Sequence, residues 1–128
     1  MDLRSPNEMP LDPPPEQKGQ ATSVLTPNRL VCRSCQFILT DQPRRIRRQG
    51  QCQFVLANPF GLLFEIELYA QLFALPLGPP SSEFTWFPGY CWQVLMCPGC
   101  NQHLGWFFSR SDDAFWALIR SRIQILSY

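Results

Sequence analysis

The 128-residue chain has a single lysine, Lys18, and a single histidine, His103. Lys18 lies in a proline-rich N-terminal stretch, so every basic side chain of the expected folded part is an arginine or that histidine. A catalytic mechanism based on lysine is therefore excluded from this part of the chain.

Long apolar runs are also missing. No stretch of about 18 apolar residues that would span a bilayer occurs, and residues 1–25 hold acids and prolines in place of the basic and apolar regions of a signal peptide. We therefore expect a cytoplasmic or nuclear location. A secreted location is the alternative if a signal peptide is missing from this form.

Charge of one sign is absent as well. Eleven basic and ten acidic residues leave a net charge of +1, which gives no electrostatic reason to expect nucleic acid or a membrane as a partner. The one local cluster comprises Arg44, Arg45, Arg47 and Arg48. It fits a phosphate-binding or nuclear-targeting patch, but a solvated hairpin tip is the commoner meaning and is the one we favour.

The length allows one domain with one core. Residues 1–26 are rich in proline and poor in large apolar side chains, so we expect a disordered tail there. Residues 27–128 form the expected domain.

The domain is predicted to be mainly β. Residues 62–69 alternate, with Phe64, Ile66 and Leu68 on one face, which is the period of a half-buried strand. The turn at residues 58–61 pairs this strand with the one before it, and residues 76–82 are expected to form a loop. The predicted strands cover residues 51–57, 62–69, 90–96 and 103–109.

A short C-terminal helix is predicted after Ser111, which fits an N-cap followed by Asp112 and Asp113 in the first turn. Apolar and basic residues then recur at helical spacings of three and four; they are Phe115, Leu118, Ile119 and Arg122. Trp116 is assigned to packing within this helix.

Two C-x-x-C pairs, Cys32 with Cys35 and Cys97 with Cys100, make up the four-cysteine ligand set of a closed zinc site. Sixty-one residues separate Cys35 from Cys97, so one structural Zn²⁺ would join two distant hairpin tips. Four thiolates leave no open position for a catalytic water.

Other roles for the sulfur and imidazole groups are weaker. A redox C-x-x-C is the alternative for the pairs, although nothing resembles the βαβ context of thioredoxin. His103 is expected to be a hydrogen-bonded residue at the edge of a pocket and not a surplus ligand. Cys52 and Cys91 are expected to be small buried hydrophobes, and a disulfide between them is the alternative if the protein is exported.

Three of the four tryptophans, Trp86, Trp92 and Trp106, flank the second cysteine pair. By spacing alone, such residues commonly fill the core of a small β domain. Rings that converge next to a metal-pinned turn also form aromatic walls that bind flat rings or cations. The spacing leaves both interpretations open.

An ordered set of motifs resembles the CULT domain, the family of the C-terminal thalidomide-binding domain of cereblon. The motifs are Trp86-Phe87-Pro88-Gly89-Tyr90-x-Trp92, Cys97-x-x-Cys100-x-x-His103-x-Gly105-Trp106-x-Phe108, Cys32-x-x-Cys35, Asn58-Pro59-x-Gly61 and Phe115-Trp116-x-Leu118. Together they cover about residues 28 to 120. We therefore interpret the chain as a stand-alone protein that resembles this family.

The resemblance implies a β-tent fold of two antiparallel sheets pinned by the four-cysteine zinc site. It implies that Trp86, Trp92 and Trp106 form a cage for a cyclic imide, such as the glutarimide of thalidomide-type drugs, or for a modified peptide terminus. Backbone groups of Phe84 and Trp86 would bind the imide, with Asn58 and Phe108 at the edge of the pocket.

The sequence departs from the family in two ways. Vertebrate cereblon members carry histidine where this chain has Phe84 and Phe60, which puts the preference at the cage mouth in question. The chain also shows no Lon-like domain and no helical region by which cereblon engages a cullin ubiquitin ligase, so we expect no direct docking to that ligase.

Three other functions remain as alternatives to a non-enzymatic binding module. An aromatic cage for methylated ammonium groups usually adds a carboxylate, and Glu83 is the one acid close to the tryptophans in sequence. A methionine sulfoxide reductase-like enzyme would need a reactive cysteine downstream of Cys100, and none is present. A structural interaction domain is the third.

Overall fold

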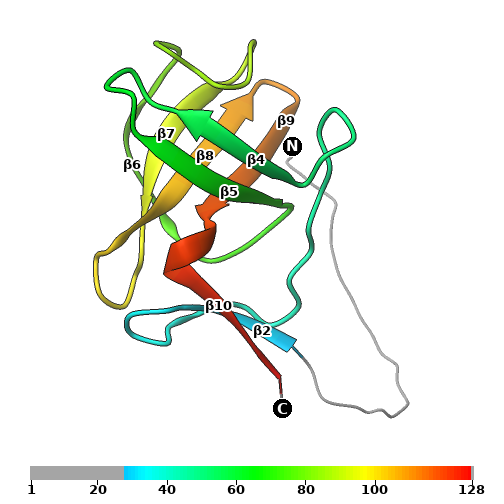
Figure 1. Cartoon of the computed structure of the whole chain (residues 1–128), viewed down its shortest axis with the longest axis vertical. Helices are drawn as coiled ribbons and strands as arrows, with labels where there is room; N and C mark the ends of the chain where they lie inside the picture. Colours follow the sequence, from blue (N-terminus) through cyan, green and yellow to red (C-terminus); the bar gives the residue numbers. More distant parts are fainter. Residues whose placement is uncertain (1–27, 128) are drawn as a thin grey trace.

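The computed structural model describes residues 28–127, which form two antiparallel sheets (Figure 1). The strands are β2 (Asn28–Cys32), β3 (Ile38–Thr40), β4 (Gln53–Ala57), β5 (Leu63–Tyr69), β6 (Leu75–Ser81), β7 (Cys91–Met96), β8 (His103–Arg110), β9 (Asp113–Ile119) and β10 (Ile123–Ser127), with a 3-10 turn, η2, at Arg120–Arg122. The prediction of a mainly β fold with two antiparallel sheets is confirmed. The expected tail, residues 1–26, lies outside the described residues.

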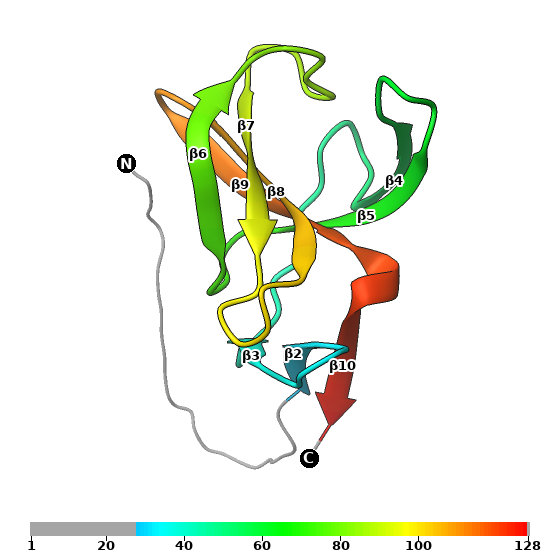
Figure 2. The same cartoon turned by 90° about the vertical axis from the view of Figure 1, so that its left-hand side faces the viewer.

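The large sheet has the order β4-β5-β9-β8-β7-β6, and the small sheet has the order β10-β2-β3. Figure 2 shows the small sheet at one end of the molecule, while the β4–β5 hairpin and the loop that follows β6 reach the opposite end. The first and last described strands pair with each other, from Asn28 opposite Ser127 to Cys32 opposite Ile123. The small sheet therefore joins the two ends of the domain.

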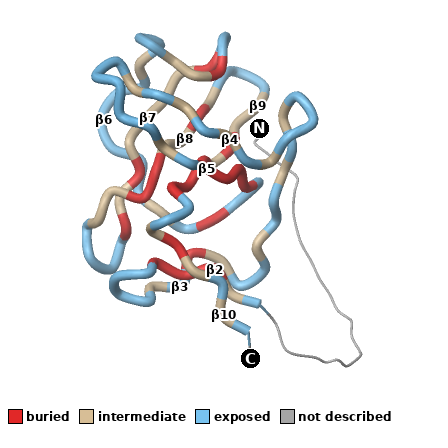
Figure 3. The backbone as a smooth tube through the Cα atoms, in the orientation of Figure 1, coloured by how far each residue is buried: buried red, intermediate tan, exposed pale blue. Residues whose placement is uncertain are grey.

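Both faces of the large sheet carry a core. On the face toward the small sheet, Leu95, Leu104, Leu118 and Tyr69 are fully buried in one apolar cluster. The other face carries a second cluster, and its members alternate with those of the first along each strand. The members of this second cluster are Ile66, Leu68, Phe87, Tyr90, Phe108, Phe115, Ala117 and Ile119. Buried stretches consequently run through the middle of the molecule (Figure 3).

The prediction of a C-terminal helix after Ser111 is wrong. Asp113–Ile119 is strand β9, a central strand between β5 and β8, and Ser111 lies in the turn before it. Phe115 and Ile119 face one cluster while Leu118 faces the other, so a strand buried on both faces produced an apolar run that also matched helical spacing. Trp116 does serve in packing, with its ring centroid 4.5 Å from that of Phe107.

The expected loop at residues 76–82 is also largely wrong, because Leu75–Ser81 is strand β6. Its prolines are tolerated because β6 is the last strand of the sheet and pairs with β7 alone. The register is interrupted between Leu77 and Ser81, where Gly78 has φ +74°. Prolines and this irregularity also discourage further strands from adding to the edge.

The arginine cluster lies on a hairpin whose backbone closes through two hydrogen bonds between Arg48 and Gln51, 2.8 and 3.0 Å long. Arg45 lies 3.4 Å from the buried carboxylate of Glu67, and Arg48 pairs with Asp113. Two of the four arginines in this cluster, Arg45 and Arg48, therefore form ion pairs within the fold.

The loop between β6 and β7 is anchored by Phe87 and Tyr90. The ring of Phe87 is 4.9 Å from Phe108 and 5.0 Å from Phe115, both edge-on. The hydroxyl of Tyr90 donates a hydrogen bond to Asp113, which also accepts from Arg48. Burial, followed by this hydrogen bond, raises the pKa of Tyr90, so the phenol stays protonated at neutral pH and donates.

Replacing Asp113 by alanine should therefore lower the free energy of unfolding by about 1–3 kcal/mol, because it leaves the Tyr90 hydroxyl and the Arg48 guanidinium without their shared acceptor. Replacing the neighbouring Asp112, whose side chain is 73% exposed, should change it by less than about 0.5 kcal/mol. Urea denaturation of the two variants measures the difference. Equal effects would contradict the anchoring role of Asp113.

Candidate functional site

The two cysteine pairs come together in space. Their four sulfur atoms all lie within 4.8 Å of one another, and two close distances join the different pairs: 3.7 Å from Cys32 to Cys100 and 3.6 Å from Cys35 to Cys97. Sulfur atoms around a tetrahedral ion at about 2.3 Å are separated by about 3.8 Å. The cluster therefore fits one metal ion held by four thiolates.

Two turns of the same construction present these sulfurs. In the first, Gln36 N donates to Cys32 O and Cys32 N donates to Phe37 O. The second repeats the pattern, since Asn101 N donates to Cys97 O and Cys97 N to Gln102 O. Gln36 and Asn101 also share a positive φ, +67° and +66°.

Close packing of the two turns requires Gly99. A Cβ atom at this position would lie 2.9 Å from Cys35 Sγ and 3.1 Å from Phe37 Cβ. Any larger residue would push the first turn away from the second.

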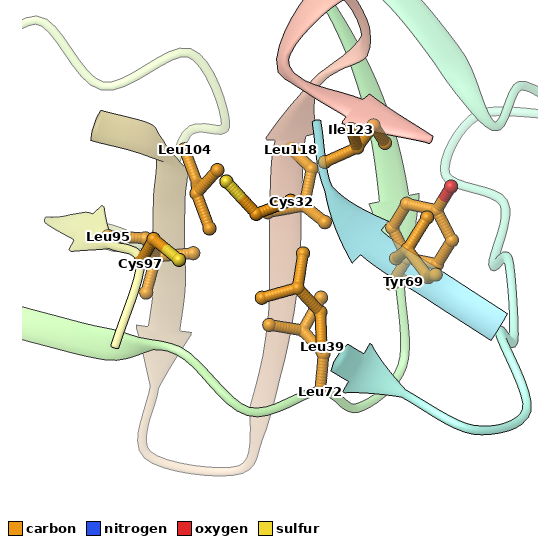
Figure 4. Close-up of a cluster of buried hydrophobic side chains, with 10 residues drawn as sticks. Cys32, Leu39, Tyr69, Leu72, Leu95, Cys97, Leu104, Leu118 and Ile123 are labelled. Atoms are coloured by element: carbon orange, nitrogen blue, oxygen red, sulfur yellow. The ribbon is translucent and has the colours of Figure 1, made fainter. Parts of the chain in front are cut away.

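The four-cysteine cluster is continuous with the core. Cys32 and Cys97 have no exposed surface, whereas Cys35 and Cys100 are exposed. Figure 4 shows Cys32, on β2, and Cys97, after β7, among the leucines of the cluster between the sheets. The site is open to solvent on one side and closed by apolar packing on the other.

Burial raises the pKa of the Cys97 thiol to about 12. Burial acts in the same direction on Cys32, but hydrogen bonds from the backbone N–H groups of Cys35 and Ser34 outweigh it and lower the pKa of that thiol. A bound cation would supply the positive charge that a thiolate at Cys97 needs.

The other cysteines and the histidine lie outside the four-sulfur cluster. Cys52 and Cys91 are free thiols with half-buried side chains. His103 Nε2 is 3.0 Å from the carbonyl oxygen of Gly105, and its ring lies 4.9 Å from that of Trp106. His103 thus makes a hydrogen bond to the backbone, as expected, and its ring packs edge-on against Trp106.

Gly105 allows the strand that carries Trp106 to approach its neighbour. A Cβ atom here would lie 1.9 Å from the carbonyl oxygen of Ala117 on β9, so no side chain fits. A register shift between Leu95 and Met96 on β7 lies opposite. The chain therefore bends at Gly105 immediately before the tryptophan.

Trp86 and Trp106 form the centre of an aromatic cluster. Their ring centroids are 4.7 Å apart at an interplanar angle of 73°, so the two indoles meet as perpendicular walls. Phe64 touches both, at 6.2 Å from Trp86 and 5.1 Å from Trp106. The alternation of residues 62–69 placed Phe64 on an apolar face, but nothing in the sequence placed it against these indoles.

Trp92 belongs to the same face, because it lies opposite Phe108 on the paired strands β7 and β8. Its indole Nε1 donates to the carbonyl of Glu83 at 2.7 Å, and Trp86 Nε1 donates to the carbonyl of Ala57 at 2.8 Å. The protein thus satisfies the polar edges of both indoles. The parts of Trp86 and Trp92 that need no hydrogen-bond partner are the apolar faces of their rings.

The three remaining predicted site residues lie around this cluster at different depths. Phe108 is 1% exposed and its centroid is 6.5 Å from that of Trp86. Asn58 follows Ala57, and its Oδ1 accepts from Phe60 N and Leu62 N, which shapes the hairpin tip. Phe84 is 76% exposed with φ +56°, a conformation that costs a bulky residue about 1–2 kcal/mol.

One buried acid was missed in the sequence. Glu67 is 5% exposed, and it accepts hydrogen bonds from Tyr69 at 2.7 Å and from Gln53 at 2.6 Å. Alternation placed it on the polar face of its strand. That face is covered because the large sheet packs on both sides.

A comparison with protein-family models found no match. The chain is 40% identical to protein cereblon of Xenopus tropicalis over 103 residues, 74% of this chain and 23% of that protein. Identity to protein cereblon is 34% over 102 residues in Gallus gallus and 29% over 102 residues in Drosophila melanogaster, each covering 73% of this chain. The aligned region spans less than a quarter of each of these relatives.

None of the described residues form a helix long and apolar enough to cross a membrane. The β-rich fold, the paired cysteine turns and the converging tryptophans agree with the similarity to cereblon from frog, chicken and fly. Over this region the chain belongs to the cereblon-like CULT domain family.

Proposed function

We propose that this domain is a non-enzymatic binding module that holds a cyclic imide, or a related flat polar ring, between Trp86, Trp92 and Trp106. The observation that carries the proposal is the nearly perpendicular arrangement of the Trp86 and Trp106 indoles, whose ring centroids are 4.7 Å apart. The indole N–H of Trp86 already donates to the carbonyl of Ala57, so it does not compete for a ligand. Flat apolar walls with few competing donors suit a planar ring.

Backbone groups beside the walls support an imide in particular. Within the described part of the chain, no hydrogen bond uses the backbone N–H or C=O of Phe84 or Trp86. An imide presents one N–H between two carbonyls and needs an acceptor and donors at fixed positions. A short loop segment with free backbone groups, next to aromatic walls, supplies both.

The metal that we propose for the four-cysteine site is one structural zinc ion. Two C-x-x-C turns that offer four thiolates at tetrahedral spacing are typical of such sites. Four ligands leave no position for a water or a substrate, and His103 binds Gly105 instead. The ion would staple the small sheet to the β7–β8 connection.

The binding proposal predicts that glutarimide quenches tryptophan fluorescence of the zinc-loaded protein, whereas uridine and trimethyllysine do not. Replacing Trp106 by alanine should weaken glutarimide binding by at least about tenfold, because one wall of the cage is lost. Trp116→Ala is the matched control, since this tryptophan packs on Phe107 on the opposite face of the sheet. It should keep the affinity for glutarimide.

Metal content, measured for each variant, separates a binding defect from a structural one. Silence toward glutarimide in a folded, zinc-loaded wild-type protein would refute the proposed ligand class. Quenching by trimethyllysine alone would assign the cage to methylated ammonium groups, and loss of zinc from Trp106→Ala would show that the indole is structural.

The metal proposal predicts one zinc per chain in a native mass spectrum and loss of the folded state when a chelator removes it. Replacing Cys97 by serine should abolish stoichiometric zinc binding. Replacing the free Cys52 should leave one zinc bound. Acidification should release the metal as the thiolates are protonated. A folded, metal-free chain that survives the chelator would contradict the stapling role.

A further inference from the structure

Strand β6 carries exposed apolar side chains along one edge of the large sheet. Leu75 is 48% exposed and Leu77 is 50% exposed, and Phe73, two residues before the strand, is 70% exposed. Single exposed apolar residues are ordinary on protein surfaces, but several of them at alternate positions of one segment mark an interaction surface.

Strand β7 widens this apolar surface. Leu75 lies opposite Met96 and Leu77 lies opposite Val94, and residues directly opposite each other on paired strands share a face of the sheet. Val94 and Met96 are half-buried, so each side chain also reaches solvent. We call these four residues the β6–β7 face, and Phe73 precedes it in the chain.

The β6–β7 face extends from the cage toward the small sheet. It meets the cage at Val94, which lies opposite Trp106. Leu75 begins β6, whereas the loop that carries Trp86 follows the other end of this strand. The backbone N–H of Phe73 binds Leu39 on the small sheet, and Figure 2 shows β6 running from the side of the small sheet up to that loop. The face is therefore a surface separate from the loop.

Charge is nearly absent from this half of the domain. Between Ala70 and Ser109 the chain has no lysine or arginine and one acidic residue, Glu83, although 16% of the whole chain is charged. Strands β6 and β7 therefore contain no Asp, Glu, Lys or Arg, and β8 has none before Arg110. Depletion of charged residues, together with enrichment in aromatic residues and methionine, is typical of the core of a protein interface.

A second copy of the chain suits this face better than a charged partner does. Charged groups of a partner would lose their hydration over a surface that offers no ion pair. Two copies of the face bring no like charges together. The apolar positions 73, 75 and 77 are symmetric about Leu75, so a two-fold axis there places Leu75 of one copy against Leu75 of the other. Such contacts, made by the same patch on both copies, are the commonest in homo-oligomers.

We propose that the β6–β7 face docks a second copy of the chain and forms a symmetric dimer with its two-fold axis at Leu75. The prolines of β6 discourage the two edge strands from pairing through their backbones, so side chains make the contact. A few apolar residues bury less area than a stable dimer needs, and the dissociation constant should be on the order of 10 µM. This inference does not depend on the ligand of the cage.

Sedimentation velocity of the zinc-loaded 128-residue chain, measured over a concentration series, tests the dimer. Leu75→Lys should weaken it by at least about tenfold, because two like charges then meet on a face without acids. Val55→Lys is the matched control. Val55 is 61% exposed on β4, at the opposite edge of the same sheet, and lies beside Glu65, so this variant should change the dissociation constant by less than about twofold.

Salt and a milder variant give further measurements. Because the β6–β7 face contains no ion pair, raising the salt concentration from about 0.05 M to about 0.5 M should not weaken the dimer. A dimer held by the arginine hairpin, residues 44–48, would weaken in the same series. Leu77→Ser should raise the dissociation constant by at least about threefold. Circular dichroism and zinc content show whether each variant is folded.

The outcomes decide between this dimer and other occupants of the face. Loss of the dimer in folded Leu75→Lys and Leu77→Ser, with Val55→Lys unchanged, would support the proposal. A chain that stays monomeric up to about 200 µM would leave the face to a different partner and overturn it. Equal effects of the two lysine variants, or a dimer that salt dissociates, would place the contact elsewhere and also overturn it. Failure of the same samples to bind glutarimide would refute the function proposed for the cage and leave the dimer standing.

Discussion

The approach of Cys32 and Cys35 to Cys97 and Cys100 is the constraint on which the other contacts depend. These pairs are separated by sixty-one residues, and closing a loop of this length costs conformational entropy that few local contacts repay. The four sulfur atoms lie at spacings that suit a metal ion, and a bound ion would offset this cost at one point.

Because Cys32 and Cys97 are also fully buried members of the cluster between the sheets, an ion bound to them and the core would stabilise each other. Loss of either would release the small sheet from the large one. A domain of about 100 residues buries a modest share of its apolar surface, so an ion bound to the four cysteines would add stability that the core alone supplies only in part.

The four-cysteine cluster is linked to the aromatic site through chain connectivity. Strand β7, with Trp92, ends immediately before Cys97, and strand β8, with Trp106, begins three residues after Cys100. Gly105 and the register shift opposite it then set the direction of Trp106. Trp86, in contrast, is carried by a loop, and its place depends on Phe87 in the core and on one hydrogen bond to Ala57. Two walls are thus fixed by the sheet, and one wall is fixed by side-chain packing.

Much of the fold and of the site could be predicted from the sequence where a pattern has one physical meaning. The strand 62–69 alternates because one face is apolar, and two C-x-x-C pairs have few uses besides a metal. The wrong predictions fall where one pattern has two meanings. The run from Ala114 to Ile119 fits a helix and a strand buried on both faces equally well. The prolines of β6 indicate a loop unless the strand is known to lie at an edge, and that knowledge is tertiary.

The depth of each site residue could not be predicted, because it depends on neighbours that come from other strands. Phe84 and Phe108 look alike in sequence as aromatic residues close to the tryptophans, yet one is 76% exposed and the other 1% exposed. Phe108 is directed inward by strand alternation opposite Trp92. Phe84 is directed outward by a left-handed backbone conformation that no propensity scale favours for phenylalanine. Phe84 therefore has an exposed apolar side chain and a backbone conformation that is unusual for phenylalanine, and neither property follows from the local sequence around it.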